Sequence, residues 1–72
     1  MLGNPKFQRE QMVSFSWETE GEMKHYDGVV YVVDPFGTAE QTQEPSYDIG
    51  VYLDGEVVLF KHIPESFVSD RA

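Results

Sequence analysis

The sequence predicts a small all-β domain whose sheet curls and closes into a five-stranded barrel, and three observations lead to that fold class. Apolar residues nowhere recur at the three- and four-residue spacing of an amphipathic helix. Short runs rich in β-branched and aromatic residues are separated instead by turn-forming Gly, Pro and Asp. A chain of 72 residues buries surface for only one core, so we expect a single domain with an ordered core over about residues 6–68.

The first strand is expected at residues 11–18. Its apolar residues alternate with polar ones in the period-two pattern of a half-buried strand, which points Val13, Phe15 and Trp17 inward. Residues 19–27 are polar and show no periodic apolar positions, so we expect a solvated loop there.

The second strand is expected at residues 28–34, a run of β-branched and aromatic residues without alternation. Such a run fits a strand that is covered on both sides or one that bends between two neighbours. Two inward sets therefore stay open, either Val29, Tyr31 and Val33 or Val30 and Val32.

A type I turn is expected at residues 34–37, because Pro presets φ at the second position, Asp bonds to its own backbone and Gly suits the fourth position. The chain reverses there. Residues 38–43 are polar and are expected to form a short edge strand or an extended return segment, which ends at a Glu-Pro pair.

A tight hairpin is expected around Asp54-Gly55, two residues that suit the positive φ values of a type I′ turn. The strand before this turn directs every second side chain inward, namely Tyr47, Ile49, Val51 and Leu53. The strand after it is expected at residues 56–61.

One 3₁₀ turn is expected at residues 63–68, a segment that contains a proline and is too short for an α-helix. This turn places Ile63, Phe67 or Val68 against the sheet. We expect residues 69–72 to form a frayed tail, as chain ends commonly do.

This order of parts is similar to that of an SH3-like barrel. Residues 63–68 resemble the Pro-containing 3₁₀ turn of SH3 domains, and residues 18–27 take the place of their acidic first loop. SH3 domains that bind Pro-rich peptides carry a Trp at the start of the third strand, whereas the single Trp here is Trp17 in the first strand. The resemblance therefore implies the fold and does not imply a Pro-rich ligand.

A second resemblance covers about residues 6–68. The stretches Glu-Pro-Ser-Tyr-Asp-Ile at residues 44–49 and Lys-His-Ile-Pro-Glu-Ser at residues 61–66 resemble small uncharacterised proteins of Gram-positive bacteria and their phages. This resemblance implies a fold and a phage or mobile-element origin, and it brings no catalytic residues.

Composition narrows the class of partner. Thirteen acidic residues against five basic ones give a net charge of −8, which repels nucleic-acid phosphates because the cations are scattered. Cysteine is absent, which removes disulfides, thiolate zinc sites and thiol catalysis and fits a reducing cytoplasmic setting. No apolar run reaches the length of a membrane helix, so we expect a soluble protein without a membrane partner.

The sequence predicts no metal, no cofactor and no enzymatic activity. His25 and His62 are far apart in the sequence and have no carboxylate at a diagnostic spacing, so surface or structural roles are favoured over a metal site. Neither a Gly-rich phosphate loop nor a nucleophile motif occurs.

Ten aromatic residues are more than a core of this size can hold, so some of them are expected on the surface. The strand alternation sends Tyr52 outward, and Phe36 falls at a turn tip. With Tyr26 or Tyr31 they form a candidate interaction surface. The alternative interpretation is that Tyr52 and Tyr31 only stack as a cross-strand pair.

Carboxylates of residues 18–27 form the second candidate feature, because such groups attract the basic side chains of a partner. The alternative is a solvated loop whose charge keeps the protein soluble. The residues concerned are Glu18, Glu20, Glu22 and Asp27.

These observations favour a non-enzymatic protein-interaction module that presents an aromatic and acidic face to an unknown protein partner. Two alternatives stay open. In the first, the acidic surface mimics nucleic acid and inhibits a DNA- or RNA-acting enzyme. In the second, the protein is a structural homo-oligomer that pairs through residues 38–43. Monomer and weak homo-oligomer are both compatible with the sequence.

Overall fold

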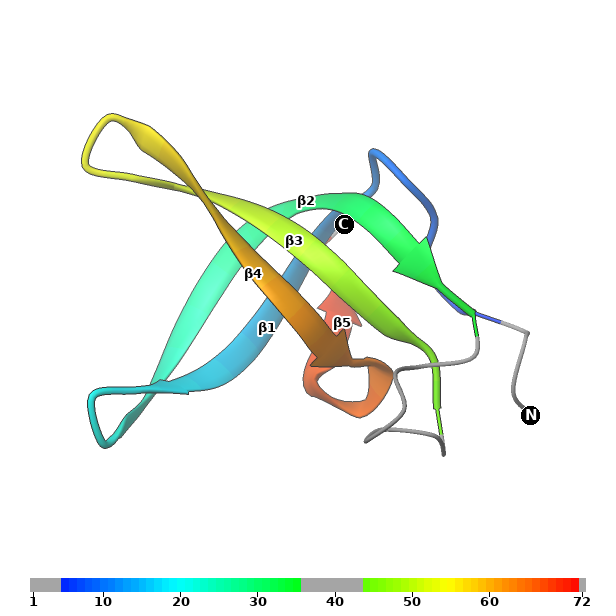
Figure 1. Ribbon diagram of the computed structural model, residues 1–72, viewed down its shortest axis with the longest axis horizontal. Helices are drawn as coiled ribbons and strands as arrows, with labels where there is room; N and C mark the ends of the chain where they lie inside the picture. Colours follow the sequence, from blue (N-terminus) through cyan, green and yellow to red (C-terminus); the bar gives the residue numbers. More distant parts are fainter. Residues whose placement is uncertain (1–4, 36–43, 72) are drawn as a thin grey trace.

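The computed structural model describes residues 5–35 and 44–71, and within them all strands belong to one antiparallel sheet (Figure 1). The all-β class predicted from the sequence is therefore confirmed. A single 3₁₀ turn, η1, lies between the last two strands. The elements are β1 (Met12–Thr19), β2 (Glu22–Asp34), β3 (Ser46–Leu53), β4 (Glu56–Pro64), η1 (Glu65–Phe67) and β5 (Val68–Asp70).

The sheet has the order β4-β3-β2-β1-β5, so four strands follow one another as a meander and β5 returns to pair with β1. Among the described residues β4 and β5 are the two edges of the sheet. The sheet is thus open, and the closed barrel expected from the sequence is not observed.

The open sheet is nevertheless strongly coiled, as side-chain contacts across it demonstrate. The rings of Phe15 on β1 and Phe60 on β4 meet edge to face with centroids 5.4 Å apart, although β2 and β3 lie between these strands. In a flat sheet, strands three positions apart are separated by roughly 14 Å. The coil therefore folds the two ends of the meander over a shared interior.

That interior is the core of the domain. Tyr26 joins Phe15 and Phe60 there, with its ring centroid 4.7 Å from that of Phe60. The alternation predicted for the first and third strands is confirmed at most of its inward positions. The buried apolar residues are Phe7, Val13, Phe15, Val30, Tyr47, Ile49, Val51 and Ile63.

Residues 19–27 were expected to form a loop, and this expectation is wrong. β1 pairs with β2 without interruption from Met12↔Val29 to Thr19↔Glu22. The turn consists of Glu20 and Gly21, both of which have positive φ, as a two-residue hairpin requires. The segment lacks apolar periodicity because this end of the hairpin extends beyond the core, where backbone hydrogen bonds hold it together.

A β-bulge in β2 makes both inward sets proposed for residues 28–34 wrong. The register with β3 shifts between Val30 and Val32, so neither regular alternation holds. Val30 is buried, and Tyr31 and Val32 are each 48% exposed. The bulge thus explains why this run shows no period-two pattern.

Gly28 allows the close approach of β2 and β3. A Cβ atom at this position would lie 2.5 Å from the carbonyl oxygen of Gly50 and 2.8 Å from a methyl group of Ile49. Contacts this short with backbone are not compatible with any side chain, so the strong coil of the sheet depends on a glycine here.

Replacing Gly28 by Ala is expected to lower the free energy of unfolding by about 1–3 kcal/mol, because the added methyl forces two strands apart. Chemical denaturation followed by far-ultraviolet circular dichroism measures this change. Gly50→Ala is the matched control, since the atoms nearest to its Cβ would be those of the exposed, movable ring of Tyr31 and not backbone. An equal loss in both variants would contradict the role assigned to Gly28.

The hairpin predicted at Asp54-Gly55 is confirmed. Leu53 pairs with Glu56, and the two turn residues have φ values of 50° and 83°. In Figure 1 this hairpin, drawn in yellow, extends away from the rest of the sheet. Leu53, which was expected to point into the core, is 36% exposed because it lies at the protruding end.

The 3₁₀ turn predicted near the C-terminus is confirmed at Glu65–Phe67, and Ile63 is the residue that packs in the core. The frayed tail expected after it is wrong for the described residues. Val68–Asp70 form β5, which pairs with β1 in the register Phe15↔Val68 to Val13↔Asp70. A three-residue strand carries too little pattern for detection from sequence.

Glu65 connects three separate parts of the chain. Its carboxylate accepts hydrogen bonds from the hydroxyl of Tyr47 at 2.6 Å and from the backbone N–H of Lys6 at 2.8 Å. The Tyr47 hydroxyl in turn accepts a bond from the backbone N–H of Phe7. Burial raises the pKa of Tyr47 well above its ordinary value, and the bond to Glu65 raises it further.

Two features predicted from the sequence lie outside the described residues. These are Phe36, at the expected turn tip, and the edge strand expected at residues 38–43. The described part of the chain contains no helix with the length and apolar character needed to span a membrane.

Candidate functional site

An open groove of about 490 Å³ lies at the end of the β1–β2 hairpin, a volume within the range of ligand-binding clefts. Apolar side chains form most of its surface, and carboxylates stand at its side. We call it the Trp17 groove. Its lining residues are Trp17, Glu18, Glu20, Gly21, Met23 and Phe67.

The groove forms where the C-terminal segment leaves the sheet. β5 covers β1 only from Val13 to Phe15, and the chain before β5 is the 3₁₀ turn instead of a strand. Trp17 lies beyond the covered part of β1. Its indole and the ring of Phe67 therefore meet across the gap, edge to face, with centroids 5.4 Å apart.

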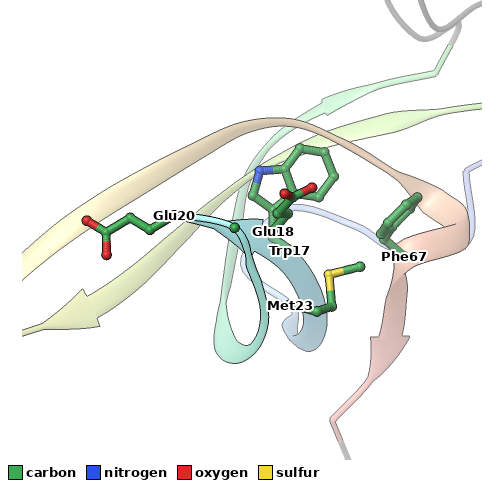
Figure 2. A pocket seen from close by; sticks show the side chains of 6 residues that line it. Trp17, Glu18, Glu20, Met23 and Phe67 are labelled. Carbon is green, nitrogen blue, oxygen red and sulfur yellow. The ribbon is translucent and has the colours of Figure 1, made fainter.

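The aromatic pair is only partly covered. Phe67 is 41% exposed and Met23 is 64% exposed, which is high for apolar side chains that face one another. Figure 2 shows Met23 pointing toward Phe67, with Trp17 above them. The groove thus presents two aromatic rings and a flexible thioether to solvent.

The two carboxylates have different positions in the groove. Glu18 follows Trp17 on β1, and Glu20 lies in the turn. In Figure 2 the side chain of Glu20 extends away from the aromatic rings. Both side chains are exposed. The arrangement suits a ligand that carries an apolar stem and a positive charge, since aromatic faces and carboxylates both attract cations.

The aromatic residues predicted as a surface are distributed over different places. Tyr52 is 73% exposed and lies on β3 beside the protruding hairpin, and Tyr31 lies over Gly50. Tyr26 is half-buried, packs in the core and shares a hydrogen bond with the hydroxyl of Thr19. Tyr26 is therefore not part of an exposed aromatic face.

Three of the four predicted carboxylates, Glu18, Glu20 and Glu22, lie at the β1–β2 hairpin, whereas Tyr52 lies beside the turn of the β3–β4 hairpin. Figure 1 shows the β1–β2 hairpin, in cyan, and the β3–β4 hairpin pointing in different directions. Glu18 and Glu20 line the Trp17 groove, whereas Glu22 does not. The structure thus brings the acidic residues together with Trp17, and not with the tyrosines named from the sequence.

Sequence reasoning missed three components of this site, because Trp17 was expected to point inward and neither Met23 nor Phe67 was named as a surface residue. Met23 falls in the segment expected to be a loop, and Phe67 was assigned to packing against the sheet. One feature of the sequence could have indicated the site. The strand alternation continues from Phe15 to Trp17, and the residues that follow Trp17 are too polar to cover its large indole.

Asp27 forms a separate polar cluster that joins β1, β2 and the C-terminal segment. The Ser14 hydroxyl donates a 2.6 Å hydrogen bond to its carboxylate, and the Arg71 guanidinium lies 3.4 Å away. The Ser14 bond lowers the pKa of Asp27, and Arg71 lowers it further. His25 lies 3.8 Å from the same carboxylate. This cluster has a structural role, since it holds β5 beside β1.

The two histidines lie in different parts of the sheet. His25 is on β2, and the backbone N–H of His62 on β4 donates a hydrogen bond to the Asp48 carboxylate. Within residues 5–35 and 44–71 no group of three or more His, Asp or Glu side chains is arranged to hold a metal ion.

Comparison of the chain with protein-family models, with curated proteins and with solved structures gave no match.

Proposed function

We propose that this protein is a non-enzymatic interaction module whose Trp17 groove binds a basic side chain of a protein partner. The observation that carries the proposal is the Trp17–Phe67 pair beside the carboxylates of Glu18 and Glu20, in which Phe67 is exposed and Trp17 is half-buried. An arginine or lysine side chain matches this groove, because its apolar stem covers the rings and its charge meets the carboxylates.

The charge of the whole molecule supports the same class of partner. A net charge of −8 attracts basic segments over a distance and raises their association rate. The carboxylates that line the groove are exposed, so their electrostatic contribution is modest and depends on salt. We expect affinity to come mainly from the aromatic contact and specificity from the charge.

We further infer that the sheet belongs to the SH3-like class. The support is the meander of four strands and the 3₁₀ turn that follows β4, both expected from the sequence resemblance, together with the return of β5 to β1, which the sequence did not predict. The ring contact between β1 and β4 shows that the coil already brings distant strands together. A cytoplasmic location and a phage or mobile-element origin complete this proposal.

A labelled peptide that contains one arginine between apolar residues is expected to bind the protein, and the same peptide with citrulline in place of arginine is expected to bind at least fivefold more weakly. Replacing Glu18 and Glu20 together by Gln should weaken binding of the arginine peptide by about two- to tenfold, which corresponds to roughly 0.4–1.4 kcal/mol for two exposed ion pairs. Fluorescence anisotropy measures both effects.

Glu22→Gln is the control for this experiment, since Glu22 lies on the same hairpin outside the groove. It should change affinity by less than about twofold, a small long-range effect of one exposed charge. Equal losses in the Glu22 variant and the double variant would assign binding to general acidity instead of the groove.

A further inference from the structure

The outer edge of β4 is the second surface that the fold leaves open. One side of this strand pairs with β3, and in the described residues no strand pairs with its other side. Every second residue of an antiparallel edge strand directs its N–H and C=O groups away from its neighbour. The regular part of this strand, residues 56–60, therefore offers a template for a further strand, and a bulge with positive φ at His62 ends it.

The side chains along this edge are unusually apolar for solvent. Val57, Val58 and Leu59 follow one another, and all three are exposed. Because successive side chains in a strand point to opposite faces, both faces of the hairpin present uncovered apolar groups. On the face that carries Val57 and Leu59, the register with β3 places Tyr52 opposite Val57.

The charges of β4 show which strand fits this edge. An acidic residue, Glu56, begins the strand, and a basic residue, Lys61, follows the apolar residues. When two copies of such a strand pair antiparallel, the acidic end of each lies beside the basic end of the other. The sequence of β4 is therefore complementary to itself in this direction, whereas a parallel copy would place like charges together.

We propose that β4 pairs antiparallel with β4 of a second copy of this chain, so that the two sheets join around a twofold axis near Leu59. The apolar residues of the two edges cover one another on both faces of the joined sheet, which a single hairpin cannot achieve. The pairing uses residues of β4 and none of the residues that line the Trp17 groove, so this inference does not depend on the proposed function.

Charge exchange tests this pairing. Sedimentation equilibrium should show a wild-type dimer. Glu56→Lys or Lys61→Glu alone should raise the Kd of the dimer about tenfold, because each variant places like charges at positions 56 and 61 of the two copies and the twofold axis produces this contact twice. The double variant, which exchanges the two ends of the strand, should return the Kd to within about threefold of wild type. Glu20→Lys makes the same charge change at the other hairpin and should not weaken the dimer.

The result of Glu56→Lys separates pairing from general charge repulsion. This variant makes the strongly acidic protein less negative, so repulsion alone would strengthen association, whereas β4 pairing weakens it. A wild-type protein that stays monomeric at millimolar concentration would overturn the proposal. So would association that extends beyond a dimer, or that the charge exchange leaves unchanged, since either result assigns the contact to another edge or surface.

Hydrogen exchange of the wild-type protein provides an independent test that needs no variant. Amides on the outer side of β4 should exchange more slowly as protein concentration rises, and those of β5 should not change. Exchange in β4 that is independent of concentration would also overturn the proposal.

Discussion

Replacing Phe15 by Ala is expected to cause the largest loss of stability of any substitution considered for this protein. Phe15 is 1% exposed, and its ring contacts Tyr26 and Phe60 in the interior where the coiled sheet meets itself. Removing a buried phenylalanine ring costs about 3–5 kcal/mol. A domain of this length has a total stability of roughly 4–11 kcal/mol, so the loss is a large fraction of the whole.

Urea denaturation measured by circular dichroism provides the test, with Phe67→Ala as the matched control. The same ring is removed there from a partly exposed position, so a loss of about 1 kcal/mol is expected. If the two variants lost the same stability, the ring contacts between β1 and β4 would not be the centre of the core.

The second large effect is expected at alkaline pH and depends on Tyr47. A free tyrosine releases its proton near pH 10, whereas the folded protein holds the Tyr47 proton to higher pH because the hydroxyl is buried and bonded to Glu65. Above pH 10 the unfolded chain therefore binds fewer protons than the folded one. The free energy of unfolding then falls by up to about 1.4 kcal/mol per pH unit from this group.

Tyr47→Phe should remove that part of the alkaline slope, although it also lowers stability at neutral pH by about 1 kcal/mol through the lost hydrogen bonds. Urea denaturation at several pH values from roughly 9 to 11, which span the ordinary tyrosine pKa, measures the slope. Tyr52→Phe is the control, because Tyr52 is exposed. An unchanged slope in Tyr47→Phe would contradict the buried hydrogen bond to Glu65.

The elements that the sequence predicts correctly are those with a strong local pattern. The alternation around Phe15 and the Asp54-Gly55 turn depend on neighbours in the chain, so they are visible without the fold. The extended part of β2 before Asp27 depends on pairing with β1 instead, and its polar composition hides it. β5 depends on pairing for the same reason.

The candidate site depends on contacts between distant residues, and this limited its prediction. The acidic residues Glu18 and Glu20 were identified because charge is a property of each residue alone. Phe67 was assigned to packing, because only the departure of η1 from the sheet leaves its ring beside Trp17 and open to solvent. The bulge at Tyr31 similarly changed which aromatic residues share a face.

The most direct test of the proposed function uses the fluorescence of Trp17, the single tryptophan of the chain and the centre of the groove. Titration with the arginine peptide is expected to change its emission in a saturable way, with the same Kd as anisotropy, and the change should be lost with the citrulline peptide. Binding seen by anisotropy without any change in Trp17 emission would place the partner elsewhere and contradict the account.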